Sequence, residues 1–206
     1  MVIQHNIAAN NAYRNLSSNA SNGQKNLEKL SSGYRINRSA DDAAGLAISE
    51  QMRSKINGLD QATSNANDAI GLIQTAEGAL TETHSMLQRM VTLATQSANG
   101  TYNSTARGAI AEEVDALQKE INRIASTTDY NGVKPLSQTN TITVQIGPTA
   151  GEKLEVATAA MSTTALGIDA ISVSSTTKAN AAITKINTAI NTVSTHRAKL
   201  GASQNR

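Results

Sequence analysis

Apolar residues recur at alternating steps of four and three residues from position 52 to position 98. Eleven of the fourteen positions are apolar, and the register does not slip. The positions are Met52, Ile56, Leu59, Thr63, Ala66, Ile70, Ile73, Glu77, Leu80, His84, Leu87, Val91, Ala94 and Ala98. A 3.5-residue repeat of this length predicts one helix of about 70 Å that packs along its whole length against another helix.

A second stripe runs beside the first on the same predicted helix. Its positions are Ala62, Asn65, Ala69, Leu72, Ala76, Ala79, Thr83, Met86, Met90 and Leu93. Two stripes on one helix indicate two neighbours, so the chain must supply further long helices.

Three further helices are predicted from the same spacing. The first covers residues 1–33, stops at Gly33 and is too polar to be stable alone. The second lies between the reversal at 101–105 and Thr128, and it should run antiparallel to the long helix because the reversal is short. The third begins near Ala179. Their heptad positions are Tyr13, Leu16, Ala20, Gly23, Leu27 and Leu30; Ile110, Val114, Leu117, Ile121 and Ile124; and Ala179, Ile183, Ile186, Ile190, Val193, Arg197, Leu200 and Gln204.

Shorter signals fill the segments between these helices. Residues 39–42, Ser-Ala-Asp-Asp, resemble an N-cap for the long helix. Residues 141–146 and 154–156 alternate with period two, which predicts a β-hairpin lying outside the helical rod. Leu166-Gly167-Ile168 forms a short apolar knot in a Ser/Thr-rich connector. The fold class is therefore mainly α: an elongated antiparallel helical bundle or coiled-coil rod with a small β-hairpin.

The composition suits thin helical seams. The chain of 206 residues has no Phe, no Trp and four Tyr, so it lacks the aromatic area of a thick globular core. The net charge of +2 gives no case for a nucleic-acid partner. The absence of Cys excludes disulfides and thiolate chemistry. No run is long enough for membrane insertion, and the N-terminus does not read as a cleavable signal peptide.

No catalytic constellation is present, and neither a cofactor nor a metal is expected. His5, His84 and His196 lie far apart, and only His84 falls on a predicted core stripe, where a polar seam residue is the favoured interpretation. Gly71 and Gly78 are isolated in helix, like Gly45 and Gly58, and are expected to allow close helix approach. An enzyme on an unfamiliar helical scaffold would need an enclosed pocket, which a thin rod hardly offers.

Several ordered motifs resemble the bacterial flagellins. They are Leu30-Ser31-Ser32-Gly33-Tyr34-Arg35-Ile36-Asn37, Asp41-Asp42-Ala43-Ala44-Gly45, Leu87-Gln88-Arg89, Gln96-Ser97-Ala98-Asn99-Gly100-Thr101, Tyr130-Asn131-Gly132-Val133-Lys134 and Leu200-Gly201-Ala202-Ser203-Gln204-Asn205-Arg206. The resemblance extends through nearly the whole chain. It implies a secreted structural subunit of the flagellar filament, located on the extracellular flagellum, that supports motility.

The resemblance also implies a domain layout. Residues 1–42 would be the N-terminal part of the inner terminal domain, and residues 43–206 the rod-shaped outer-core domain, with no sizeable variable surface domain. A further C-terminal helix is expected after Arg206, and it would pair with the first helix. The implied partners are other flagellin subunits, which would contact Ile3, Ile7, Tyr13 and Leu16, and the flagellar export and cap machinery.

The family is further implied to be a ligand of the host innate receptor Toll-like receptor 5. The positions that match the family's contact residues are Arg89, Leu93 and Glu113, and the expected neighbours of these residues are Gln88, Gln96 and Ile110. Arg89 falls opposite the main seam, where its planar guanidinium is free to meet a partner. Leu93 also ends the second stripe, so it can equally pack internally or face a partner.

Two alternatives remain open at this point. A flagellar hook-associated junction protein resembles flagellin at its ends. A cytoplasmic coiled-coil adaptor would fit the seams, although the hairpin does not suit it.

Overall fold

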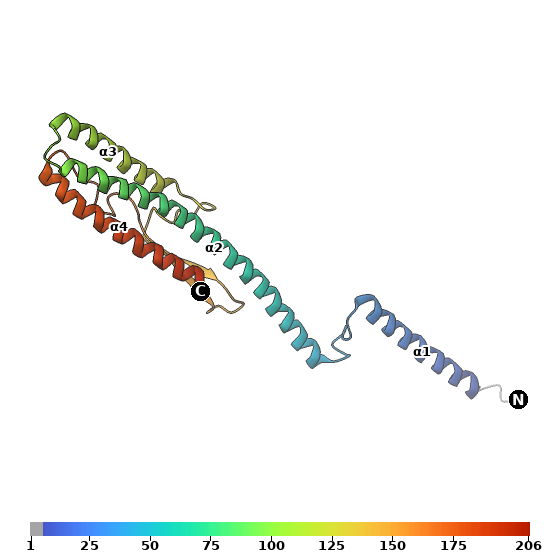
Figure 1. The fold of residues 1–206 in the computed structure, drawn as a ribbon. Helices are drawn as coiled ribbons and strands as arrows, with labels where there is room; N and C mark the ends of the chain where they lie inside the picture. The colour runs from blue at the N-terminus through green and yellow to red at the C-terminus, as the bar shows by residue number, and fades with distance from the viewer. Residues whose placement is uncertain (1–5) are drawn as a thin grey trace. The chain divides into compact units, whose positions relative to one another are not determined.

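The structure, a computed structural model, describes residues 6–206. These residues form four helices and two strands (Figure 1): α1 (Ile7–Ser32), α2 (Ala43–Ala98), α3 (Ser104–Thr127), β1 (Asn140–Gln145), β2 (Lys153–Thr158) and α4 (Thr176–Asn205). The predicted mainly α fold with one small antiparallel hairpin is confirmed. The chain divides into two compact units, residues 1–58 and 59–206. The domain boundary suggested at 42/43 stays a prediction.

The second unit is built on α2, which α3 and α4 flank as antiparallel neighbours (Figure 1). Arg89 of α2 pairs with Glu113 of α3 at 2.7 Å, and Glu77 of α2 meets Arg197 of α4 at 3.4 Å. One continuous apolar cluster joins the three helices to β2 and the connector before α4. Leu80 of α2, Ile121 of α3, Ile186 of α4 and Val156 of β2 are all 0% exposed.

The long helix is a single element of 56 residues, as predicted, but its burial begins only at Ala62. Met52, Ile56 and Leu59 are 59%, 57% and 51% exposed. The prediction that the helix packs along its whole length is therefore wrong for its first part, because no described residue covers these side chains. The heptad repeat indicates a partner, but it does not place that partner in the same chain.

Both stripes of α2 enter the core beyond this point. The first contributes Ile73, Leu80, Leu87 and Ala94, which are spaced by seven residues and are at most 1% exposed. The second contributes a larger set of buried residues: Ala62, Ala69, Leu72, Ala76, Thr83, Met90 and Leu93. The prediction of two helical neighbours for α2 agrees with this arrangement.

The buried face of α4 differs in phase from the predicted one. Four predicted core residues are buried: Ala179, Ile186, Val193 and Leu200. Between them the helix buries Ala182, Ala189 and His196. The predicted residues at these levels, Ile183, Ile190 and Arg197, are only half-buried. Small residues face the neighbouring elements because they permit a short separation between helices, while the larger isoleucines cover the sides of the seam.

The hairpin packs against the helices and does not lie outside them, so that part of the prediction is wrong. Its strands pair antiparallel, with Ile142 opposite Val156 and Val144 opposite Leu154. Val156 is 0% exposed and belongs to the main core. A two-stranded sheet is marginal alone and gains stability only when its apolar face is covered.

The connector between β2 and α4 is also part of the core. Its apolar residues are buried: Met161, Leu166, Ile168, Ile171 and Val173. Polar side chains of α3 fix it in place, since Asn122 Nδ2 donates to Thr163 Oγ1 at 2.9 Å and Gln118 Nε2 donates to the Ile168 carbonyl at 2.5 Å. The apolar segment predicted at Leu166 to Ile168 thus extends from Met161 to Val173.

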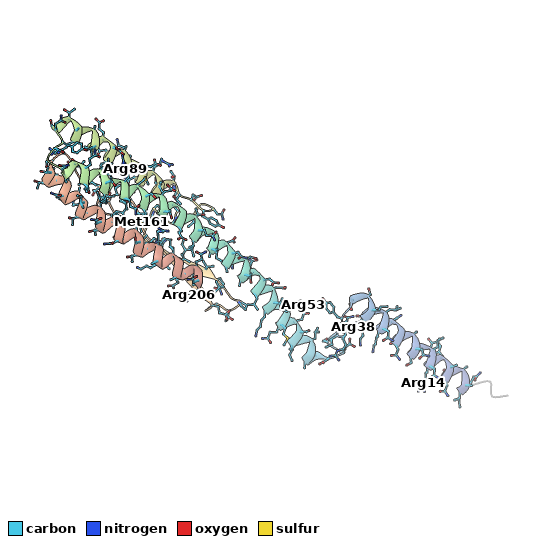
Figure 2. All side chains as sticks on the ribbon, in the orientation of Figure 1. Arg14, Arg38, Arg53, Arg89, Met161 and Arg206 are labelled. Atoms are coloured by element: carbon cyan, nitrogen blue, oxygen red, sulfur yellow. The ribbon has the colours of Figure 1, made fainter. Side chains whose placement is uncertain are left out.

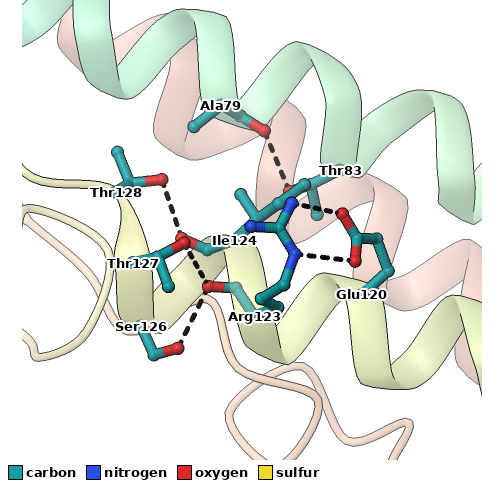
Figure 3. Close-up of polar contacts among 8 residues, drawn as sticks. All are labelled: Ala79, Thr83, Glu120, Arg123, Ile124, Ser126, Thr127 and Thr128. Atoms are coloured by element: carbon teal, nitrogen blue, oxygen red, sulfur yellow. Dashed lines mark hydrogen bonds and ion pairs between the residues drawn. The ribbon is translucent and has the colours of Figure 1, made fainter.

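Hydroxyl groups satisfy helix carbonyls where the core meets the C-terminal end of α3 (Figure 3). Thr83 is 1% exposed, and its hydroxyl donates to the Ala79 carbonyl at 3.0 Å. Thr127 and Thr128 donate to the carbonyls of Arg123 and Ile124, each at 2.7 Å. Each hydroxyl thus bonds the carbonyl four residues before it, which satisfies the hydroxyl without a partner from another element.

Two of the isolated helical glycines permit a close approach, although not to a helix. A Cβ at Gly45 would lie 2.9 Å from Ile36 Cδ1 in the preceding connector. A Cβ at Gly71 would lie 2.8 Å from Tyr130 Oη, so the ring of Tyr130 rests on α2 at this position. A Cβ at Gly78 would meet nothing within 4 Å, so the packing role predicted for that residue is wrong.

In the first unit, α1 begins at an Asn6 cap and ends at Gly33, whose φ of 73° suits glycine at a helix C-cap. The following connector folds back on the helix end. Arg38 Nε lies 2.9 Å from Glu28 Oε1, and this hydrogen bond raises the pKa of Arg38. At the start of α2 the Asp42 carboxylate accepts the backbone N–H of Gly45 at 2.9 Å. Asp42, and not Ser39, therefore supplies the cap.

The phase of α4 can be tested with matched leucine substitutions. We expect Ala189→Leu to destabilise the protein by about 1–3 kcal/mol, because it overfills a fully buried seam. Ile190→Leu, one residue further on the half-buried side, should cost less. Urea unfolding followed by circular dichroism measures both. The reverse order of stabilities would show that the isoleucine side is the packed one.

Candidate functional site

The first candidate surface is the apolar stripe of α1. None of the residues of this helix is buried. Ile7, Tyr13 and Leu16 are 71%, 71% and 68% exposed, and Leu27 and Leu30 follow them at 66% and 81%. Ile3, also predicted to take part in self-assembly, lies outside the described residues. We call Ile7, Tyr13, Leu16, Leu27 and Leu30 the α1 stripe.

The first part of α2 in the same unit carries a second uncovered set. Ile48, Met52 and Ile56 are all more than half exposed and recur every four residues. Single exposed apolar side chains are ordinary, but a row of them at helical spacing marks an interaction surface. Both rows are thus uncovered within residues 6–58 and can bury apolar area against a partner.

The second candidate surface lies on α2 and α3 of the second unit. Arg89 projects from α2 (Figure 2), and its Nε and Nη2 atoms contact Glu113 Oε1 at 2.8 Å and 2.7 Å. Both side chains remain about half exposed, at 53% and 44%. Because both side chains are about half exposed, the pair is accessible to a partner. An exposed ion pair of this kind contributes little to folding.

Two predicted neighbours flank this pair on the exposed side. Gln88 lies 3.0 Å from His84 Nε2, and Gln96 donates to Tyr102 Oη at 3.1 Å. We name Gln88, Arg89, Gln96 and Glu113 the Arg89 surface. The sequence interpretation did not include Tyr102, which lies in the reversal between α2 and α3 and meets Gln96 only in the folded chain.

The other two predicted receptor residues do not reach this surface. Leu93 is 1% exposed and Ile110 is 7% exposed, and both belong to the core cluster. The alternative in which Leu93 packs internally is therefore the one that the structure adopts. These two side chains support the helices beneath the Arg89 surface, and neither presents atoms to a partner in this conformation.

The burial of the histidines differs from the prediction made from the sequence. His84 is half-buried, whereas His196, which was not placed on a core stripe, is 6% exposed and its Nε2 has no hydrogen-bond partner. Burial lowers the pKa of His196, and the nearby Lys199 lowers it further. His5 lies outside the described residues. Within residues 6–206 no three His, Asp or Glu side chains converge on a metal-sized site, and no helix is long and apolar enough to cross a membrane.

Comparison with known proteins identifies the family of this chain. Residues 3–141, more than half of the chain, match the bacterial flagellin N-terminal helical region. The chain belongs to the flagellin family. Flagellins are structural subunits and not enzymes, so the prediction that the chain is not an enzyme is confirmed.

Individual flagellins show how far the similarity extends. The chain is 64% identical to the flagellin of Clostridium tyrobutyricum over 136 residues, which are 66% of this chain and 36% of that relative. It is 48% identical to the flagellin of Halalkalibacterium halodurans over 209 residues, which cover 100% of this chain and 77% of that relative. The present chain thus spans about a third of the length of the first relative and about three quarters of the length of the second.

Solved structures support the same assignment. The crystal structure of Bacillus cereus flagellin matches with a TM-score of 0.62 at 33% identity, over 68% of this chain and 82% of that one. A Vibrio parahaemolyticus protein assigned to the hook-associated group matches with a TM-score of 0.66 at 14% identity, over 82% of this chain and 90% of that one. The second match shows the fold alone.

The buried histidine predicts an acid-sensitive flagellin fold. Because the folded state holds the pKa of His196 below the unfolded value of about 6.5, the unfolded chain binds more protons as the pH falls. Stability is therefore full above pH 6.5 and decreases as the pH falls through the folded pKa. Urea midpoints at several pH values between 7.5 and 5 measure the effect.

His196→Leu should flatten this dependence, while the control His84→Gln should retain it. Equal pH dependence in the His196→Leu protein and the unsubstituted protein would count against a role of His196.

Proposed function

We propose that the chain is a secreted subunit of the extracellular flagellar filament, which self-assembles through its helices and supports motility. The exposure of the α1 stripe carries this proposal. Its large side chains have no cover within the described residues. Burying a Leu or Ile side chain contributes roughly 1.5–3 kcal/mol, so a row of them against neighbouring subunits is a strong driving force.

The two compact units suit different parts of this role. Residues 59–206 have a continuous apolar core of their own. Residues 1–58 have no buried apolar residue on α1, which is typical of a segment ordered by association. In this proposal 1–42 are the inner-domain segment and 43–206 the outer-core rod. Export and cap proteins of the flagellum are the further partners.

Two alternative functions differ in location. A hook-associated junction protein would be confined to one end of the filament, and the shared fold does not separate it from a filament subunit. A cytoplasmic coiled-coil adaptor would stay inside the cell. Flagellin identity over the whole chain favours the filament subunit over both.

A second proposed role is recognition by Toll-like receptor 5 through the Arg89 surface. The guanidinium of Arg89 is held by Glu113, which fixes its plane before a partner arrives. A fixed, half-exposed Arg loses less conformational entropy on binding than a free one. Leu93 and Ile110 contribute to this surface by packing beneath it.

Self-assembly can be tested on the α1 stripe. We expect Leu16→Ser, in the whole protein, to abolish or strongly shorten filaments seen by electron microscopy. The folding of residues 59–206 should be unchanged, because Leu16 is 68% exposed and belongs to the other unit. Asn15→Ser beside it is the matched control and should assemble normally. Normal filaments from Leu16→Ser would remove the stripe from the assembly interface.

Receptor recognition can be tested on the ion pair. Arg89→Ala should weaken binding to a receptor fragment by about 2 kcal/mol, roughly 30-fold in Kd, because it removes a central anchor. Arg123 is a matched control, since it also pairs with a glutamate, Glu120, at 2.5 Å (Figure 3) and its side chain is 60% exposed. Arg123→Ala should bind like the unsubstituted protein. Unchanged affinity of Arg89→Ala would remove Arg89 from the site.

A further inference from the structure

The charges of the second unit are unevenly distributed among its helices. Residues 176–206, which include α4, contain five Lys or Arg residues and no Asp or Glu. Only Arg197 has a carboxylate partner, Glu77 of α2. The cations that remain on the body of the helix are Lys178, Lys185 and Lys199, and all three are exposed.

These three lysines lie on one side of α4. Lys185 follows Lys178 by seven residues, and Lys199 follows Lys185 by fourteen, with exposed Thr192 at the level between them. A step of seven residues is close to two helical turns, so the side chains form a row. None of them takes part in an ion pair among residues 6–206. We call Lys178, Lys185 and Lys199 the lysine row.

The exposed side of α2 carries the opposite charge at the same spacing. Asp68 and Glu82 are separated by fourteen residues, with Thr75 at the level between them. Both carboxylates are exposed and neither has an ion-pair partner in the described part of the chain. Between residues 59 and 88 no Lys or Arg offsets them, and Arg89, seven residues after Glu82, is already paired with Glu113. We call Asp68 and Glu82 the acidic row.

We propose that the lysine row of one copy docks on the acidic row of a second copy, so that Lys185 pairs with Glu82 and Lys199 pairs with Asp68, because α4 of one copy runs antiparallel to α2 of another copy that points the same way. This inference rests on the proposed filament function and names a contact within it. Fourteen residues of helix span about 21 Å in both rows, so two straight helices can form both pairs at once. Charge complementarity at a matched spacing is what selects a second copy as the occupant.

The symmetry of this contact suits a filament. The two rows lie on different helices, so each copy offers one lysine row and one acidic row. A contact between two different surfaces is heterologous, and it propagates into an open helical array unless the rotation closes a ring. A contact of one surface with itself would stop at a dimer.

The lysine row and the acidic row determine the register between two copies more than the affinity between them. Exposed ion pairs are individually weak, while like charges in the wrong register repel. The apolar α1 stripe supplies the general attraction, which many staggered arrangements would satisfy. The paired rows favour the stagger in which both lysines meet carboxylates.

Charge reversal in the whole protein tests the contact. Lys185→Glu with Lys199→Glu, or Asp68→Lys with Glu82→Lys, should raise the critical concentration for filament growth from seeds by about tenfold, since each places like charges opposite one another. The chain with all four reversals should regain assembly. All four side chains are exposed and unpaired, so the variants should fold, and urea unfolding confirms it.

A control and a salt series complete the design. Lys119→Glu on α3, which is exposed and outside both rows, should leave growth unchanged. The critical concentration of the unsubstituted protein should rise with ionic strength, because salt screens exposed pairs. It should rise less in Lys185→Gln with Lys199→Gln.

The outcomes separate this inference from the filament proposal. If the unsubstituted whole protein forms no filaments, the filament proposal fails. If it grows and both double reversals grow equally well, the row contact alone is rejected. If the lysine reversal blocks growth and the fourfold reversal does not restore it, the lysine row meets some other anionic surface, and the pairing is overturned.

Discussion

Close packing of small side chains along α2 and α4 is the constraint on which the second unit depends. Ala76 of α2 and Ala182 and Ala189 of α4 are at most 2% exposed, so both helices bury small side chains in the same apolar cluster. A chain without Phe or Trp cannot fill a wide gap between elements, and its stability therefore requires the helices to lie close together. Close packing alone permits sliding by a heptad. The contact of Glu77 with Arg197 opposes such a slide, because a shifted register would leave a half-buried charge without its partner.

Much of this arrangement is predictable from the sequence, because heptad spacing, glycine stops and period-two runs are local signals. The extent of α2 and the stop at Gly33 agree with the structure. The phase of α4 was not predictable in the same way. Ile183 and Ala182 are both apolar and adjacent, so hydrophobicity alone cannot decide which faces the neighbour, and the larger residue was chosen wrongly. The packed side is set by the helix separation, which depends on residues of other elements.

For the Arg89 surface too, the sequence predicted which residues lie near one another but not which way each side chain points. A motif places Arg89, Leu93 and Glu113 near one another, and the structure brings Arg89 and Glu113 into contact. It turns Leu93 into the core, because position 93 lies on the side of α2 that also buries Met90 and Ser97. Tyr102 escaped notice since its contact with Gln96 depends on the reversal between two helices. Residues transferred by matching alone thus include both surface groups and the core that supports them.

On the α1 stripe and at the start of α2, the sequence predicts buried side chains, but these side chains are exposed in the structure. A heptad pattern records the environment in which a helix functions, whether its partner belongs to the same chain or to another. From Ala62 onward the apolar positions of α2 are covered by other elements of the same chain, and the core closes. In residues 1–58 the pattern is unsatisfied at Ile7, Tyr13, Leu16, Met52 and Ile56. Because a soluble monomer gains nothing from such rows, their presence argues for a partner, and a helix-forming subunit of the same kind has the matching spacing.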